Sequence, residues 1–146
     1  MREIKTEIVI SAPVPKVWNV LTNFNGWQEW NPVVNKTSGT STLGSELSIV
    51  MKGEDGNDGA KYAPVVTISE EPKSFCWRAK MMAEFLFTNE KVFELEKTAS
   101  GTRLIHKELF KGLLVPIFWG KINGGVPDIL NSMNSALKTQ VEQSVQ

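Results

Sequence analysis

The sequence has one cysteine, one histidine and no excess of charge of either sign. Because Cys76 has no second cysteine to pair with, an internal disulfide is excluded, and we expect a cytoplasmic protein. Sixteen basic and sixteen acidic residues cancel without runs of like charge, so the electrostatic signature of a nucleic-acid-binding protein is missing. A lone histidine and a distant cysteine do not supply the four ligands of a usual zinc site, and we expect neither a metal nor a cofactor.

Long apolar runs are also missing. The longest, Leu113–Trp119, contains Pro116 and is far shorter than the roughly 20 residues that a membrane-spanning helix needs. The first residues, Met1–Lys5, carry charges where a signal peptide has its apolar segment. We therefore expect neither export nor an integral membrane segment. A length of 146 residues predicts one domain with a full core, spanning residues 1–146.

A periodic apolar stripe predicts a long amphipathic helix over Val126–Val145. Its members recur at steps of three and four: Val126, Leu130, Met133, Leu137, Val141 and Val145. Pro127 is expected in the first turn, where its missing N–H is not required, and the two glycines before it indicate a break there. Asn134 falls on the polar face. Such a helix needs one large apolar partner.

The preceding sequence is mostly strand-like. Alternation predicts a first strand at Ile4–Ile10, and two short helices follow at Pro13–Leu21 and Phe24–Trp30. Further strands are predicted at Leu47–Met51, Tyr62–Ser69, Phe75–Met81, Phe85–Glu96 and Leu104–Phe110. Because strands do not alternate with helices, we predict an α+β fold in which a curved antiparallel sheet of about seven strands surrounds the C-terminal helix.

Several segments resemble one known superfamily. Ser11-Ala12-Pro13, followed by Val17-Trp18 and then by the segment Trp27–Pro32, resembles the opening of the SRPBCC superfamily, which includes START, pollen-allergen and polyketide-cyclase-like proteins. The segment Gly101–Gly112 resembles the last strand of its bacterial polyketide cyclase/dehydrase branch. The resemblance covers nearly the whole chain and is weakest between residues 38 and 60.

This resemblance implies a helix-grip fold with a cavity between the sheet and the final helix. Members of the superfamily bind lipids, sterols, quinones or polyketides in that cavity, and some catalyse cyclisation while others assist chaperones. Because one fold hosts many functions, the resemblance alone does not choose among them.

Aromatic and apolar side chains are the first candidates for lining such a cavity, because ligand pockets are mainly apolar. The same residues would also serve as ordinary core packing against the helix. The candidates for ligand contact are Trp30, Phe75, Trp77, Phe85, Phe87, Phe93, Phe110, Phe118, Met133 and Leu137. The segment Leu113–Trp119 is either a buried connector or a gate, since the glycines after it permit a hinge.

His106 and Glu108 are the polar candidates. They lie two residues apart and therefore on one face of one strand. Together they would position a ligand hydroxyl or carbonyl, or His106 would act as a general base in an aldol-type cyclisation, since its usual pKa of about 6.5 suits proton transfer near neutrality. The alternative is a partly buried histidine that is hydrogen-bonded to a neighbour.

Three functions from different classes follow. The leading one is binding or transport of a hydrophobic small molecule, such as a lipid, quinone or polyketide, without a metal. The second is a polyketide cyclase, aromatase or dehydratase with His106 and Glu108 as acid and base. The third is a protein-interaction module of the chaperone-activator kind, with a protein partner that the sequence does not identify.

Overall fold

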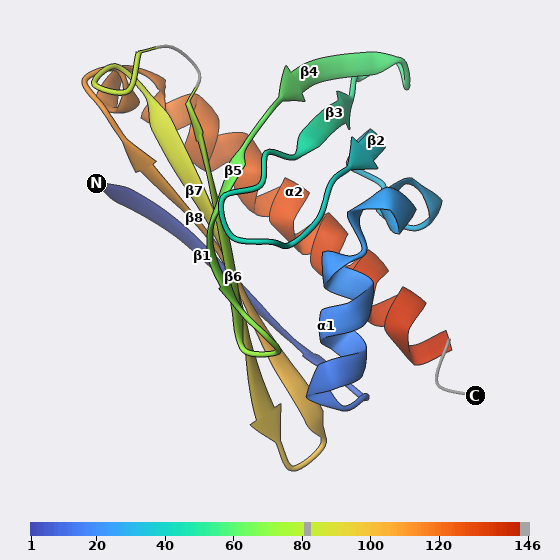
Figure 1. Ribbon diagram of the computed structural model, residues 1–146. Coiled ribbons are helices and arrows are strands. Elements are labelled where there is room, and N and C mark those ends of the chain that lie inside the picture. Colours follow the sequence, from blue (N-terminus) through green and yellow to red (C-terminus); the bar gives the residue numbers. More distant parts are fainter. Residues whose placement is uncertain (81–82, 144–146) are drawn as a thin grey trace.

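The computed structural model describes residues 1–80 and 83–143, so the predicted positions Met81 and Val145 lie outside the described residues. The protein has an α+β fold with antiparallel sheets and a long C-terminal helix (Figure 1). In chain order the elements are β1 Arg2–Ile10, α1 Val14–Thr22, the 3-10 helix η1 Phe24–Glu29, β2 Val34–Ser38, β3 Ser48–Lys52, β4 Asp58–Tyr62, β5 Val65–Glu70, β6 Ser74–Lys80, β7 Thr88–Thr98, β8 Gly101–Lys111 and α2 Val115–Gln143.

The strands form two sheets instead of the single seven-stranded sheet that we predicted. One sheet has the order β1-β8-β7-β6-β5 and the other β2-β3-β4. The predicted strand Tyr62–Ser69 is divided between β4 and β5 because Pro64 has no N–H with which to continue a ladder. An isolated bridge between Glu46 and Val65 still joins the two sheets. This arrangement is consistent with the helix-grip fold.

The strand predicted at Phe85–Glu96 begins later, at Thr88. The N–H of Leu113 donates to the carbonyl oxygen of Phe85 at 3.1 Å, so the backbone here pairs with the junction between β8 and α2. Phe85 therefore lies in a turn, and 67% of its surface is exposed.

Helix α2 begins at Val115, well before the predicted Val126. Pro116, and not Pro127, lies in its first turn, where a missing N–H is tolerated. Pro127 and the two glycines before it lie inside the helix, so the predicted break is wrong. The segment Leu113–Trp119, which we expected to be a connector or a gate, mostly forms the first turns of this helix. The predicted apolar stripe is buried at Leu130, Met133, Leu137 and Val141.

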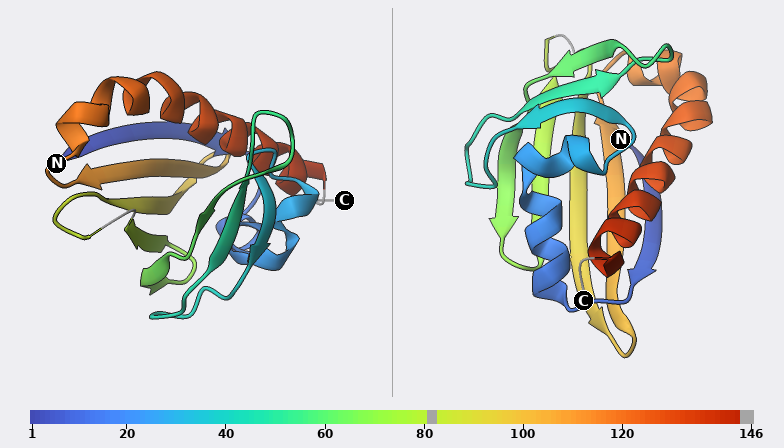
Figure 2. Two further views of the ribbon diagram at one scale, coloured as in Figure 1. Left: turned by 90° about the horizontal axis from the view of Figure 1, so that it is seen from above. Right: turned by 90° about the vertical axis from the view of Figure 1, so that its right-hand side faces the viewer.

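The two α-helices lie on the same face of the five-stranded sheet (Figures 1 and 2). Helix α2 contacts β1 and β8, α1 contacts β7 and β8, and the helices contact each other. The 3-10 helix packs against β2, which brings the three-stranded sheet to the same side.

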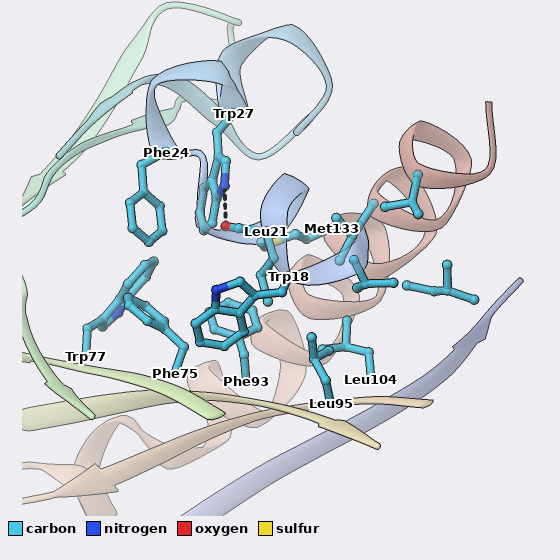
Figure 3. Packing of buried hydrophobic residues seen from close by; sticks show 14 of the residues in the cluster. Trp18, Leu21, Phe24, Trp27, Phe75, Trp77, Phe93, Leu95, Leu104 and Met133 are labelled. Carbon is cyan, nitrogen blue, oxygen red and sulfur yellow. Dashed lines mark hydrogen bonds between the residues drawn. The ribbon is translucent and has the colours of Figure 1, made fainter. Parts of the chain in front are cut away.

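Aromatic rings fill the space between the five-stranded sheet and the segment α1–η1 (Figure 3). The Trp27 ring lies 5.8 Å from Trp77 and 6.4 Å from Phe93, measured between ring centroids. Its Nε1–H donates to the carbonyl oxygen of Leu21 at 2.9 Å. Phe75 completes the cluster and is fully buried. This cluster fixes one boundary of the site described next, because Trp27 and Trp77 also belong to the cavity wall.

Candidate functional site

A cavity of about 250 Å³ lies between the two sheets and the middle of α2. Most of its wall is apolar. The residues that line it are Trp27, Asn31, Val33, Val34, Ile49, Met51, Tyr62, Pro64, Trp77, Ala79, Phe87, Asn89, Lys91, Glu108, Phe110, Ile122, Val126, Ile129 and Met133.

The structure places only part of the predicted ligand-contact set in this wall. The predicted residues that line the cavity are Trp77, Phe87, Glu108, Phe110 and Met133. Phe75, Phe93 and Leu137 are fully buried in the neighbouring core, beyond the cavity. Trp30 is half-buried against Trp27, and Phe85 and Phe118 are exposed. His106 is fully buried but is not part of the wall.

Strand parity identified the correct faces but not which part of each face reaches the cavity. Phe75, Trp77 and Ala79 alternate along β6 and share one face. Trp77 and Ala79 line the cavity, whereas Phe75 is covered by Trp18 and Phe24 from the α1–η1 segment, with ring centroids 6.4 and 5.3 Å away. Packing by the α1–η1 segment therefore places Phe75 in the hydrophobic core, whereas Trp77 and Ala79 lie in the cavity wall.

Glu108 is the centre of the polar part of the wall. Its Oε1 accepts a hydrogen bond from Asn89 Nδ2 at 2.7 Å, and its Oε2 lies 4.0 Å from Lys91 Nζ. Lys91 also lies over the Trp77 ring, 5.9 Å from its centroid. Burial raises the pKa of Tyr62 above its ordinary value, and the negative charge of Glu108 raises it further. A carboxylate, an ammonium, an amide and a phenol thus meet on one cavity surface.

Four polar residues of the wall are not among the predicted ligand contacts: Asn31, Tyr62, Asn89 and Lys91. A signal existed for two of them, because Asn89 and Lys91 share the parity of Phe93 along β7 and pair with Phe110 and Glu108 across the hairpin. Asn31 lies in the loop after η1 and Tyr62 at the end of β4, and nothing in the local pattern connects either residue to β8.

His106 belongs to a closed polar network outside the wall. Thr6 Oγ1 donates to the His106 carbonyl oxygen at 2.9 Å, and Asn134 Nδ2 donates to Thr6 Oγ1 at 2.8 Å. Since the hydroxyl has only one hydrogen, this order turns Asn134 Oδ1 toward His106 Nδ1, 2.8 Å away, which must carry the proton. The imidazole also stacks on Phe93, with 4.4 Å between centroids. The network connects β1, β8 and α2, and it corrects the prediction that Asn134 lies on the polar face of the helix.

Burial lowers the pKa of His106 well below 6.5, and the positive charge of Lys91 lowers it further, although the hydrogen bond to Asn134 opposes this shift. The imidazole is therefore neutral near pH 7. Within the described residues its Nε2 has no hydrogen-bond partner. His106 therefore joins the sheet to α2 through hydrogen bonds to its neighbours, and it is fully buried, whereas the alternative had it partly buried.

The lowered pKa makes the stability of the protein depend on pH in one direction. Between the lowered folded-state pKa and about pH 6.5, the unfolded chain binds a proton at His106 that the folded chain does not bind. We therefore expect the free energy of unfolding to fall by up to about 1.4 kcal/mol per pH unit as the pH drops below about 6.5. Urea unfolding between about pH 7.5 and pH 5 measures this slope.

His106→Gln is the control, because the sequence has no other histidine to titrate in this range. The variant should be less stable but should show a much flatter pH dependence. Equal slopes in the two proteins would contradict a buried neutral imidazole.

No group of three or more His, Cys, Asp and Glu side chains in residues 1–80 and 83–143 is arranged to hold a metal ion. In the same part of the chain, no helix has the length and apolar character needed to cross a membrane.

Comparisons with known proteins agree with the fold and with the resemblance. A crystal structure of a protein from Nitrosomonas europaea superimposes with a TM-score of 0.79 at 19% identity, covering 97% of this chain and 94% of that one. A crystal structure of a protein from Mesorhizobium loti superimposes with a TM-score of 0.72 at 20% identity, and the match covers 99% of this chain and 100% of that one. The di-domain ARO/CYC protein StfQ from the steffimycin biosynthetic pathway gives 0.79 at 11% identity; the match covers 97% of this chain and 51% of StfQ.

No curated protein sequence matches the chain significantly. The sequence profile of the family described as "Polyketide cyclase / dehydrase and lipid transport" matches residues 1–142. Nearly the whole chain is included in that match, which confirms the predicted SRPBCC resemblance. The protein therefore belongs to the polyketide cyclase / dehydrase and lipid transport family.

Proposed function

We propose that this protein binds a hydrophobic small molecule in the cavity between the sheets and α2 and carries or presents it without chemical change. The observation that supports this most strongly is the cavity itself, whose wall is mainly apolar with one polar cluster around Glu108. Small-molecule sites have this composition, with apolar groups supplying affinity and a few polar groups supplying orientation.

The volume indicates the size of the ligand. An engineered apolar cavity of about 150 Å³ admits benzene, so a cavity of about 250 Å³ suits a molecule of roughly two fused rings. A longer molecule would have to extend past the rim of the cavity. Ring systems and quinone-like groups therefore fit the enclosed volume better than a lipid with two acyl chains.

A cyclase-type enzyme is the second candidate. It is favoured by the Glu108 carboxylate in the cavity wall and by the similarity of fold to StfQ, which is itself described as an ARO/CYC protein. The two proposals differ in what happens to the ligand. Recovery of an unchanged ligand after incubation supports the carrier, whereas a mass change supports the enzyme. The cytoplasmic location and a protein partner remain predictions.

Filling the cavity should abolish binding. Ala79 lies in the wall on β6 and is the smallest side chain there, so the phenyl ring of Ala79→Phe would occupy the space that a ligand needs. The uncharged fluorescent probe N-phenyl-1-naphthylamine has a naphthyl group of two fused rings that suits the cavity, and its phenyl ring would extend past the rim. We expect its affinity to fall at least about tenfold, which corresponds to about 1.4 kcal/mol. Fluorescence titration measures the affinity, and circular dichroism verifies the fold.

Ser135→Phe is the matched control, because it places the same ring on the exposed surface of α2, outside the cavity wall. This variant should bind the probe as the unmodified protein does. Failure of the unmodified protein to bind the probe, together with ligand-free protein in native mass spectrometry after purification, would count against the proposed function.

A further inference from the structure

The charged part of the cavity wall is electrically balanced. Of the described residues that line the cavity, Lys91 and Glu108 carry the charges, and they have opposite signs. Their side chains are only 14% and 12% exposed, and the ammonium lies 4.0 Å from the carboxylate. Lys91 is further engaged by the face of the Trp77 ring. Since its positive charge is already matched, the cavity offers no unmatched cation to a carboxylate or phosphate group.

Two amides in the same wall have unused hydrogen-bonding atoms. Asn31 Oδ1 accepts from the Val33 N–H at 3.1 Å, which fixes the amide so that its Nδ2 is the free donor. Asn89 Nδ2 donates to the Glu108 carboxylate, which can only accept, so Asn89 Oδ1 is the free acceptor. Among the described residues neither atom has a hydrogen-bond partner, although both are buried. Buried polar groups without partners are rare and unfavourable, so a ligand that supplies partners gains affinity.

We propose that this cavity selects an uncharged ring compound that carries both a hydrogen-bond donor and an acceptor, as a phenol or a hydroxylated quinone does, and that it rejects organic anions such as fatty acids. This inference rests on the proposed function, because it specifies the ligand of the same cavity. An acceptor on the ligand would pair with the free Asn31 donor and a donor on the ligand with the free Asn89 acceptor, while the apolar wall would hold the ring. An anion would lose its hydration on entering the cavity and would find no free counter-ion, because Lys91 is already paired with Glu108.

The effect of Glu108 on Tyr62 supports this assignment, because the charge that disfavours the tyrosinate would also disfavour an anionic ligand in the same cavity. The five polar residues of the wall come from four parts of the fold: the loop after η1, strand β4, strand β7 and strand β8. All five line the same cavity.

Three naphthalene derivatives of similar size test the proposal in competition with N-phenyl-1-naphthylamine at about pH 7. 2-Naphthol has a donor and an acceptor and is uncharged, 2-methoxynaphthalene has an acceptor only, and 2-naphthoate is an anion. We expect 2-naphthol to bind most tightly, with 2-methoxynaphthalene severalfold weaker and 2-naphthoate at least about tenfold weaker.

Glu108→Gln then reverses part of the selectivity. Glutamine retains the side-chain shape and can still accept from Asn89, but it leaves the charge of Lys91 unmatched. We expect the affinity for 2-naphthoate to rise at least about tenfold relative to the affinity for 2-naphthol. Glu94→Gln is the control, because Glu94 pairs with Lys107 and does not line the cavity, and it should change neither affinity.

The outcomes separate the two proposals. If 2-naphthoate binds as tightly as 2-naphthol, or if Glu108→Gln leaves 2-naphthoate unchanged, the inferred specificity is overturned while ligand binding stands. If neither the fluorescent probe nor any of the three compounds binds, both proposals are overturned.

Discussion

Trp27→Ala is expected to lower the free energy of unfolding by about 3–5 kcal/mol. Trp27 is 2% exposed, and its ring packs against Phe24, Trp77 and Phe93, with centroids 5.2, 5.8 and 6.4 Å away. Truncation removes these contacts and leaves the Leu21 carbonyl oxygen without the indole N–H that it now accepts. Urea unfolding followed by circular dichroism would measure the loss.

Trp119→Ala is the matched control. Trp119 is half-buried on α2, packs against Phe110 with centroids 6.2 Å apart, and lies under the Arg2 guanidinium at 5.0 Å. Because part of its surface is already in water, the same truncation should cost only about 1–2 kcal/mol. Equal losses in the two variants would show that the η1 cluster is not the main core of the protein.

The burial of helical residues could be predicted from the sequence, whereas the start of α2 could not. Trp18 and Val17 lie on a clear helical face, and the stripe from Leu130 to Val141 repeats at helical spacing, so their burial follows from periodicity. The start of α2 does not follow in the same way. Pro127 and the adjacent glycines indicate a helix boundary locally, but Val115 and Leu130 pack in one cluster with Ile4 and Phe110, and this packing stabilises a continuous helix across them.

His106 and Glu108 show how far the candidate site could be predicted from the sequence. The pattern places both on one face of β8, and in the structure both side chains are largely buried. Their surroundings differ because Asn134 of α2 and Thr6 of β1 cover His106, whereas Glu108 meets Asn89 and the cavity. The sequence separations in these contacts reach 128 residues, and local spacing contains no information about them.

Local spacing also failed to predict which aromatic side chains reach the cavity. Phe87 and Phe85 share a parity, and a strand there would have placed both rings on the inner face. The backbone instead turns beside Gly112, so Phe87 enters the cavity wall while Phe85 faces water. The backbone at Gly112 therefore lies close to the turn that separates Phe85 from Phe87.

Gly112→Ala should lower the free energy of unfolding by about 3 kcal/mol or more, because two unfavourable effects combine. Gly112 has φ of +129°, a conformation that residues with a side chain rarely adopt. A Cβ at this position would also lie 2.2 Å from the Leu86 carbonyl oxygen and 2.8 Å from the Phe87 nitrogen, so the backbone itself would have to move. Urea unfolding would measure the loss of stability.

Displacement of the Leu86–Phe87 backbone in Gly112→Ala should also change the cavity, since Phe87 is part of its wall. We expect the variant to bind N-phenyl-1-naphthylamine severalfold more weakly under conditions in which it remains folded. Gly120→Ala should change the free energy of unfolding in the opposite direction, because Gly120 lies inside α2 and an added Cβ would meet no atom within 4 Å. That control should stabilise the protein by about 0.5–1 kcal/mol through helix propensity and leave probe binding unchanged. If Gly112→Ala were as stable as Gly120→Ala, the close approach of the β8–α2 junction to the Leu86–Phe87 backbone would be wrong, and with it the position of Phe87 in the cavity wall.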